Sequence, residues 1–203
     1  PLRLVGSEMC IRDRSGRVCT RNSFALKHIA GVDEVGRGCL AGPVIASAVI
    51  LKKHIPGLKD SKKLSPPQRN KLSALIIQNS FYSIGSASEQ EIDEINILQA
   101  SLLAMKRAIL NLSVEPGKVL IDGTHKPDLN VDTQTIIGGD SLIDEISAAS
   151  IVAKVYRDNL MIEFDKQYPK YGFLSHKGYG TKAHKEAILK YGPTSIHRMT
   201  FNC

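Results

Sequence analysis

Residues 29–201 alternate between short runs of apolar residues and longer stretches in which apolar residues recur at helical spacing. The short runs, rich in Val, Ile and Ala, predict strands over 29–35, 43–51, 81–87, 119–122 and 135–137. The helical spacing predicts one helix that begins after Ser65 and three more over 97–112, 142–164 and 181–191. This order predicts a mixed sheet flanked by helices, an α/β fold with a helical C-terminal region.

The first 28 residues lack both patterns, and this sets the expected domain organisation. Within them, residues 8–14 resemble a translated adapter of the kind used in sequencing libraries. We therefore expect 1–28 to be a disordered or non-native arm. The remaining residues, 29–203, are expected to form one domain that includes the C-terminal region.

Composition excludes several classes of protein. Hydrophobic residues make up 42% of the chain and charged residues 23%, as in ordinary soluble globular proteins. No stretch approaches the roughly 18 apolar residues of a membrane-spanning helix. The four cysteines form no C-x-x-C pair, which disfavours a zinc ribbon or a disulfide scaffold. Reduced thiols and a cytoplasmic location are the better interpretation.

The net charge of +7 is unevenly distributed along the chain. Residues 1–28 contain six basic and two acidic residues. Residues 29–165 contain fourteen basic and seventeen acidic residues, and residues 166–203 contain seven basic residues and one acidic residue. An acidic middle beside a basic flank suits a protein that holds metal ions and a polyanion together. Imbalances this small also arise by chance, so charge alone is weak evidence for a nucleic-acid partner.

Acidic residues close the apolar segments. Asp33 and Glu34 lie near the end of one predicted strand, Asp122 ends another, and Asp140 precedes the long predicted helix. Taken singly, they are better explained by a solvent-exposed strand end, an Asp-Gly turn and a helix N-cap. As a set, their oxygen atoms are ligands typical of Mg²⁺ or Mn²⁺. Beside a basic flank, they favour phosphodiester hydrolysis with two metal ions.

A fifth acid, Asp158, lies in the same predicted helix as Asp140. In an unbroken helix the two residues would be about 27 Å apart, so only a break would allow both to serve one site. Asp158 by itself is better explained as a surface charge or as a partner of Arg157 or Lys154.

Two glycine-containing loops could contact a ligand. The turn Gly36-Arg37-Gly38 is followed by a β-branched run rather than a helix, which excludes a dinucleotide-binding motif. It would let the backbone approach a ligand, with a plain hairpin loop as an equal alternative. The loop 176–180 combines two cations with Tyr179, which suits phosphate contacts and stacking, although a solvated loop has the same composition.

Several ordered motifs together resemble one family, bacterial ribonuclease HII. The motifs are Ala30-Gly31-Val32-Asp33-Glu34-Val35-Gly36-Arg37-Gly38, Asp60-Ser61-Lys62-Lys63-Leu64, Ile121-Asp122-Gly123, Gly139-Asp140-Ser141, the segment 146–158, Tyr171-Gly172-Phe173, His176-Lys177-Gly178-Tyr179-Gly180-Thr181 and His197-Arg198. All of them lie within residues 29–201, which make up about 85% of the chain. The sister family, ribonuclease HIII, usually has Gly-Lys-Gly in place of Gly-Arg-Gly and a folded N-terminal domain, so Arg37 favours HII.

The resemblance implies a ribonuclease H-like fold and an endoribonuclease. Such enzymes hydrolyse RNA in RNA–DNA hybrids and cut 5′ of single ribonucleotides in duplex DNA, leaving 3′-hydroxyl and 5′-phosphate ends. The implied role is ribonucleotide removal during DNA repair and replication. The implied cofactors are two Mg²⁺ or Mn²⁺ ions held by the catalytic carboxylates Asp33, Glu34, Asp122 and Asp140, with Asp158 as an auxiliary acid.

The resemblance also implies which residues bind the substrate. These are the turn Gly36, Arg37 and Gly38 with Tyr179, which would sense the 2′-hydroxyl, and the phosphate-contacting residues Ser61, Lys62 and Lys177. We expect a monomer, and recruitment by a sliding clamp is left open. Two alternatives remain, a non-catalytic duplex-binding module and another nuclease or transposase-like protein of the same fold. Cleavage of a duplex with one embedded ribonucleotide would separate all three.

Overall fold

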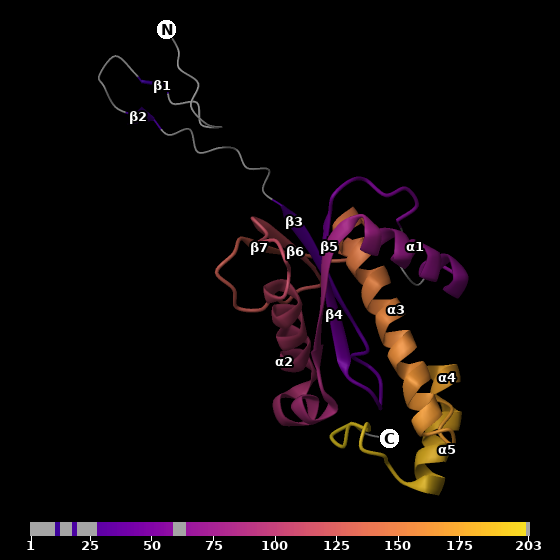
Figure 1. Ribbon diagram of the computed structural model, residues 1–203. Coiled ribbons are helices and arrows are strands. Elements are labelled where there is room, and N and C mark those ends of the chain that lie inside the picture. The colour runs from indigo at the N-terminus through magenta and orange to yellow at the C-terminus, as the bar shows by residue number, and fades with distance from the viewer. Residues whose placement is uncertain (1–10, 13–17, 20–27, 59–63, 202–203) are drawn as a thin grey trace.

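The structure is a computed structural model that describes residues 11–12, 18–19, 28–58 and 64–201 (Figure 1). The predicted arm 1–28 therefore lies largely outside the described residues. Within it, two short strands, β1 (Ile11–Arg12) and β2 (Val18–Cys19), pair antiparallel. No described helix has both the length and the apolar content needed to span a membrane.

A five-stranded sheet with the order β5-β4-β3-β6-β7 forms the centre of the fold. The strands are β3 (Ile29–Val35), β4 (Val44–Leu51), β5 (Ser80–Ala87), β6 (Lys118–Asp122) and β7 (Thr133–Ile136). The first three pair antiparallel, whereas β6 is parallel to both β3 and β7. The predicted mixed sheet is confirmed. Almost every residue of β4 is buried, which explains its continuous apolar sequence.

Helices cover both faces of this sheet (Figure 1). One face packs against α2 (Glu89–Leu110), whose small residues Ala100, Ala104 and Ala108 share a buried cluster with the strands. On the other face lie α3 (Asp144–Gln167) and α1 (Pro66–Gln78). Two further helices, α4 (Phe173–His176) and α5 (Lys182–Tyr191), pack against the C-terminal part of α3 in a third cluster.

The helix predicted over 97–112 begins earlier in the structure and ends slightly earlier. Ser88 caps α2: its hydroxyl accepts from the Glu91 N–H at 3.2 Å, and the Glu91 carboxylate accepts from the Ser88 N–H at 2.9 Å. This capping box was a readable start signal. The helix then breaks at Asn96, where φ is 66°, so the apolar periodicity becomes regular only from Ile97 onward.

Other boundaries also differ from the prediction. The long helix starts at Asp144 rather than 142, because a separate 3₁₀ turn, η2 (Gly139–Ser141), precedes it. Strand β7 starts two residues before the predicted start at 135. The one-turn helix α4 was not among the predicted helices. Asp140 thus lies outside the helix that contains Asp158, which supplies the break that a shared site would require.

The close approach of α3 to β3 depends on Gly31. A Cβ atom at this position would lie 2.0 Å from the carbonyl carbon of Glu145, in the first turn of α3. Only a residue without a side chain therefore allows the helix to sit directly on the strand. This packing fixes the start of α3, and with it the preceding turn that contains Asp140.

We predict that Gly31→Ala lowers the free energy of unfolding by about 2 kcal/mol or more, because the added methyl group meets backbone that must move. Urea denaturation of the two proteins measures the difference. Gly38→Ala is the matched control, since a Cβ there meets nothing within 4 Å. Equal stability of Gly31→Ala and the parent chain would contradict the close-packing argument.

Candidate metal and nucleic-acid site

The sheet topology brings two of the predicted acids together. Strands β3 and β6 are parallel, and Val32 is paired with Ile121. Asp33 and Asp122 are the next residues of the two strands, so they lie side by side at the same end of the strands. This is the edge at the carboxyl ends of parallel strands, where open α/β sheets bind ligands. Asp33 is buried, whereas Asp122 is half-buried at the end of its strand.

The third acid reaches the same place from the connection between β7 and α3. Asp140 lies in η2 and is buried. The N–H of Gly139 donates to the Asp122 Oδ1 atom at 2.8 Å, which ties this turn to the end of β6. The position of Asp140 therefore depends on a neighbouring carboxylate as well as on the packing of α3.

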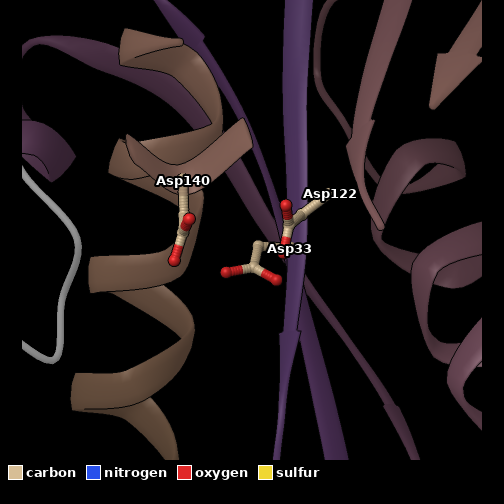
Figure 2. A group of neighbouring side chains, drawn as sticks. All are labelled: Asp33, Asp122 and Asp140. Atoms are coloured by element: carbon tan, nitrogen blue, oxygen red, sulfur yellow. The ribbon is translucent and has the colours of Figure 1, made fainter. Parts of the chain in front are cut away.

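Asp33, Asp122 and Asp140 each contribute a carboxylate oxygen to a group in which all three atoms lie within 4.8 Å of one another. Figure 2 shows the three side chains facing a common space, with Asp140 on the α3 side and the other two on strands. Three carboxylates at such short range repel one another unless a proton or a cation intervenes.

The electrostatics of Asp33 show this repulsion most clearly. Burial raises the pKa of Asp33 well above its usual range, and the negative charges of Glu34 and Asp122 raise it further. Hydrogen bonds from Ser150 and from the Glu34 N–H, the latter at 2.7 Å, only partly oppose these effects. Among the described residues, burial and the neighbouring acids therefore outweigh the interactions that favour the ionised form of Asp33.

Glu34 lies beside this group but makes a different contact. Its carboxylate is 3.1 Å from the Arg37 guanidinium, and its oxygens are not part of the 4.8 Å group. Burial raises the pKa of Glu34, and Arg37 opposes that shift. Of the four acids named from the sequence, the structure brings three together and places the fourth at their margin.

The donor set fits a divalent cation. All three close groups are carboxylates, which are the hard oxygen ligands that Mg²⁺ and Mn²⁺ prefer, and no thiol or imidazole belongs to the group. A cation would also stabilise the ionised form of Asp33, which burial and the neighbouring acids disfavour. Asp33, Asp122 and Asp140 are therefore the residues that could hold a metal ion, with Glu34 as the adjacent acid.

The predicted recognition elements lie next to the carboxylates. Tyr179 lines a cavity together with Asp33, Glu34 and Asp122. It pairs with Cys39 in an antiparallel bridge, which places the loop 176–180 against the turn that begins at Gly36. Arg37 and Gly38 are exposed, so this turn and the tyrosine ring could touch a ligand bound at the acids.

The other predicted residues have separate environments. The Lys177 ammonium donates to the Leu174 carbonyl, and no contact with the three acids is among the described interactions. Asp158 pairs with Lys154 at 2.7 Å and with Arg69 at 3.3 Å, so the predicted Lys154 partnership is observed. Ser61 and Lys62 lie outside the described residues.

Sequence reasoning missed Ser150 and Lys154 as site residues. Both line the cavity that contains Asp33 and Tyr179, and Ser150 also hydrogen-bonds Asp33. With Asp158 they recur at intervals of four residues, which places them on one face of α3. That spacing was a readable signal within a helix otherwise rich in Ala and Ile.

Comparison with known proteins gives one consistent family. The family model described as ribonuclease HII matches residues 30–203. Ribonuclease HII of Coxiella burnetii (strain Dugway 5J108-111) is 57% identical over 176 residues, 85% of this chain and 87% of that protein. Ribonuclease HII of Nitrosococcus oceani is 56% identical over 178 residues, 86% of this chain and 89% of the relative.

Solved structures share the fold. Ribonuclease H2 from Pyrococcus horikoshii OT3 superposes with a TM-score of 0.71 at 28% identity and covers 86% of this chain and 93% of its own. The RNase HII in a PCNA complex from Archaeoglobus fulgidus gives a TM-score of 0.67 at 23% identity, over 87% of this chain and 96% of that one.

We predict that Asp33→Asn stabilises the protein in a metal chelator and weakens its stabilisation by Mn²⁺. A neutral amide removes the cost of an ionised, uncompensated carboxylate, so Tm at pH 8 should rise by about 2–4 °C for each kcal/mol relieved. Because the raised pKa of Asp33 lets the native state bind its proton, this gain should shrink as pH falls.

Thermal denaturation in EDTA and in Mn²⁺, at pH 8 and at pH 5, measures both effects. Asp128→Asn is the control, because Asp128 is exposed and is not part of the carboxylate group. A Tm below that of the parent chain in EDTA would contradict the prediction. So would a rise in Tm on addition of Mn²⁺ that equals the rise seen for the parent chain.

Proposed function

The chain belongs to the ribonuclease HII family, and from this premise we propose that Asp33, Glu34, Asp122 and Asp140 are its catalytic carboxylates. As a member of that family it is an endoribonuclease that hydrolyses RNA in RNA–DNA hybrids. The observation that carries the proposal is the group of three carboxylates within 4.8 Å beside an exposed turn.

We propose that these carboxylates hold two Mg²⁺ or Mn²⁺ ions, with Asp33, Asp122 and Asp140 as the nearest ligands. Bound ions would supply activation of water and neutralisation of phosphate charge, the two requirements of phosphodiester hydrolysis. The raised pKa of Asp33, caused by burial and by the neighbouring acids, supports this assignment. An Mn²⁺ complex is known for a fold relative, RNase HIII, at 15% identity and a TM-score of 0.62.

The protein's own contribution to the reaction is positioning. Hydrogen bonds hold Asp33 through the Glu34 N–H and Asp122 through the Gly139 N–H, so both carboxylates keep their orientation before substrate binds. Hydrolysis adds water across the bond between phosphorus and the 3′-oxygen. The products are a 3′-hydroxyl on the upstream strand and a 5′-phosphate on the ribonucleotide.

Recognition of the ribonucleotide is proposed to fall to Gly36, Arg37, Gly38 and Tyr179. The 2′-hydroxyl is the group that distinguishes RNA from DNA at a single position, and it can both donate and accept a hydrogen bond. Exposed peptide groups and a half-exposed tyrosine ring next to the acids suit that task. Lys177, with Ser61 and Lys62, is proposed to contact phosphates.

The proposed biological role is removal of ribonucleotides from DNA by the domain 29–203, acting as a monomer. The PCNA complex belongs to the archaeal relative. The cytoplasmic location expected from the cysteine pattern is part of this proposal.

We predict that Asp33→Asn, Asp122→Asn and Asp140→Asn each lower turnover at least about a hundredfold, because a metal ligand loses its charge while the side-chain shape remains. Substrate binding should be largely kept. The assay is cleavage of a DNA duplex containing one ribonucleotide, in Mg²⁺ or Mn²⁺.

Asp128→Asn serves as the matched control, and an all-DNA duplex serves as the control substrate. Wild-type binding without cleavage would indicate a non-catalytic duplex-binding module. Equal cleavage of the all-DNA duplex would indicate a different nuclease of this fold.

For Tyr179→Ala we predict a larger loss on the single-ribonucleotide duplex than on a long RNA–DNA hybrid. A long hybrid offers a hydroxyl in every register, whereas one embedded ribonucleotide offers only one. Steady-state kcat/KM on both substrates gives the ratio, with an expected loss of about tenfold or more on the first. A uniform loss on the two substrates would argue against a sensing role.

A further inference from the structure

Two buried arginines contact the recognition elements, and neither has a carboxylate partner among the described residues. Arg157 on α3 is 0% exposed and Arg198, near the C-terminus, is 1% exposed. Neither forms a salt bridge with a described acid at 4.0 Å or less. Burial lowers the pKa of Arg198 to about 10, so its guanidinium still carries a charge at neutral pH. Burying two cations is costly unless they are fully hydrogen-bonded.

Backbone carbonyls satisfy Arg198. Its Nη2 donates to the carbonyl of Gly36 at 2.6 Å and its Nη1 to that of Arg37 at 2.8 Å. Its Nε and Nη2 both donate to the carbonyl of Gly42, at 3.0 and 2.7 Å. A single guanidinium therefore closes the loop 36–42 by joining its two ends.

Arg157 joins that loop to the loop containing Tyr179. Its Nη2 donates to the Ala41 carbonyl at 2.9 Å, its Nη1 to the Lys177 carbonyl at 2.8 Å and its Nε to that of Pro43 at 3.1 Å. Gly36 makes room for this side chain: with φ of 94°, a Cβ there would lie 2.3 Å from the Arg157 Nε.

The C-terminal segment that contains Arg198 is itself fastened to the loop and to α2. The Arg198 N–H donates to the Leu40 carbonyl at 2.9 Å, and Ala41 forms a bridge with His197. On the other side, the Asp93 carboxylate accepts from the N–H groups of Met199 and Thr200 at 2.8 and 3.0 Å. Arg198 is thus held by the fold rather than by the loop alone.

The hydrogen bonds of Arg198 determine where the turn presents its donors. The chain has no described cis peptide, and in a trans peptide the C=O and the following N–H point in opposite directions. The carbonyls of Gly36 and Arg37 point inward to Arg198, so the N–H groups of Arg37 and Gly38 point away from it. Among the described contacts these two N–H groups have no acceptor, and both residues are exposed.

We propose that Arg198, supported by Arg157, is a positioning residue that gives the enzyme its selectivity for a single embedded ribonucleotide. It does so by fixing two successive peptide groups so that their N–H donors face the substrate. The inference rests on the proposed function, in which this turn senses the 2′-hydroxyl. Neither arginine touches the substrate in this role.

Selectivity should suffer more than general activity when these peptide groups lose their orientation. A single ribonucleotide must be recognised in one register, and a small misplacement of a positioning element can cost about a hundredfold. In a long hybrid, neighbouring registers offer further hydroxyls to a turn that has moved. The ratio of the two activities therefore separates positioning of the turn from general loss of structure.

The test is Arg198→Lys, which keeps the charge and the aliphatic stem but has one nitrogen in place of the planar fork. We expect kcat/KM on the single-ribonucleotide duplex to fall about ten- to a hundredfold, with a much smaller fall on a long hybrid. Arg157→Lys should shift the ratio in the same direction but less. Arg107→Lys, a bidentate partner of Glu91 on α2, is the matched control and should leave the ratio unchanged.

Thermal denaturation and the backbone amide chemical shifts of Arg37 and Gly38 accompany the assay. Changed shifts at these two amides, with a changed ratio, support the proposal; if Arg198→Lys does not fold, Arg157→Lys decides in its place. Equal losses on both substrates, or an unchanged ratio, overturn it. A wild-type enzyme that does not prefer the embedded ribonucleotide over all-DNA would instead reject the proposed function.

Discussion

Parallel pairing of β3 with β6 places two carboxylates at one sheet edge, and the rest of the site is built around the charge that gathers there. Val32 pairs with Ile121, so the residues that follow them are acids held side by side. The close packing of α3 on Gly31 then brings a third acid from the preceding turn. Together these contacts concentrate negative charge, and the raised pKa of Asp33 reflects its cost.

Two buried arginines have no ion pair with the three clustered carboxylates in the described part of the chain. Arg157 and Arg198 could each neutralise an acid, yet both are saturated by backbone carbonyls on the recognition loops. A guanidinium placed among the carboxylates would occupy the position that a metal ion needs. Satisfying the arginines with peptide groups keeps the carboxylates available for cations, and it also makes the loops rigid. The carboxylates therefore serve metal binding, and the arginines separately serve the geometry of the loops.

The sequence predicted the strands and acids well because both have local signals. An apolar run that ends in an acid marks a strand end, and Asp33 and Asp122 were found in this way. The kink at Asn96 and the 3₁₀ turn at Asp140 were missed because apolar periodicity does not show them. At Asn96 the signal is a local cap, since its Oδ1 accepts from the N–H groups of Leu98 and Gln99. The role of the two arginines was missed because most of their acceptors are carbonyls more than a hundred residues away, which no residue type reveals.

The proposed chemistry and the proposed recognition are joined by one short piece of chain. Asp33 and the turn at Arg37 belong to the same strand and its immediate continuation, so at most about 14 Å of extended backbone separates them. Arg198 fixes the far end of that segment, and the sheet fixes the near end. A hydroxyl bound at the turn would consequently set which phosphate lies at the carboxylates. Cleavage at one defined bond, on the 5′ side of the ribonucleotide, then follows from the geometry of a single connection rather than from base-specific contacts.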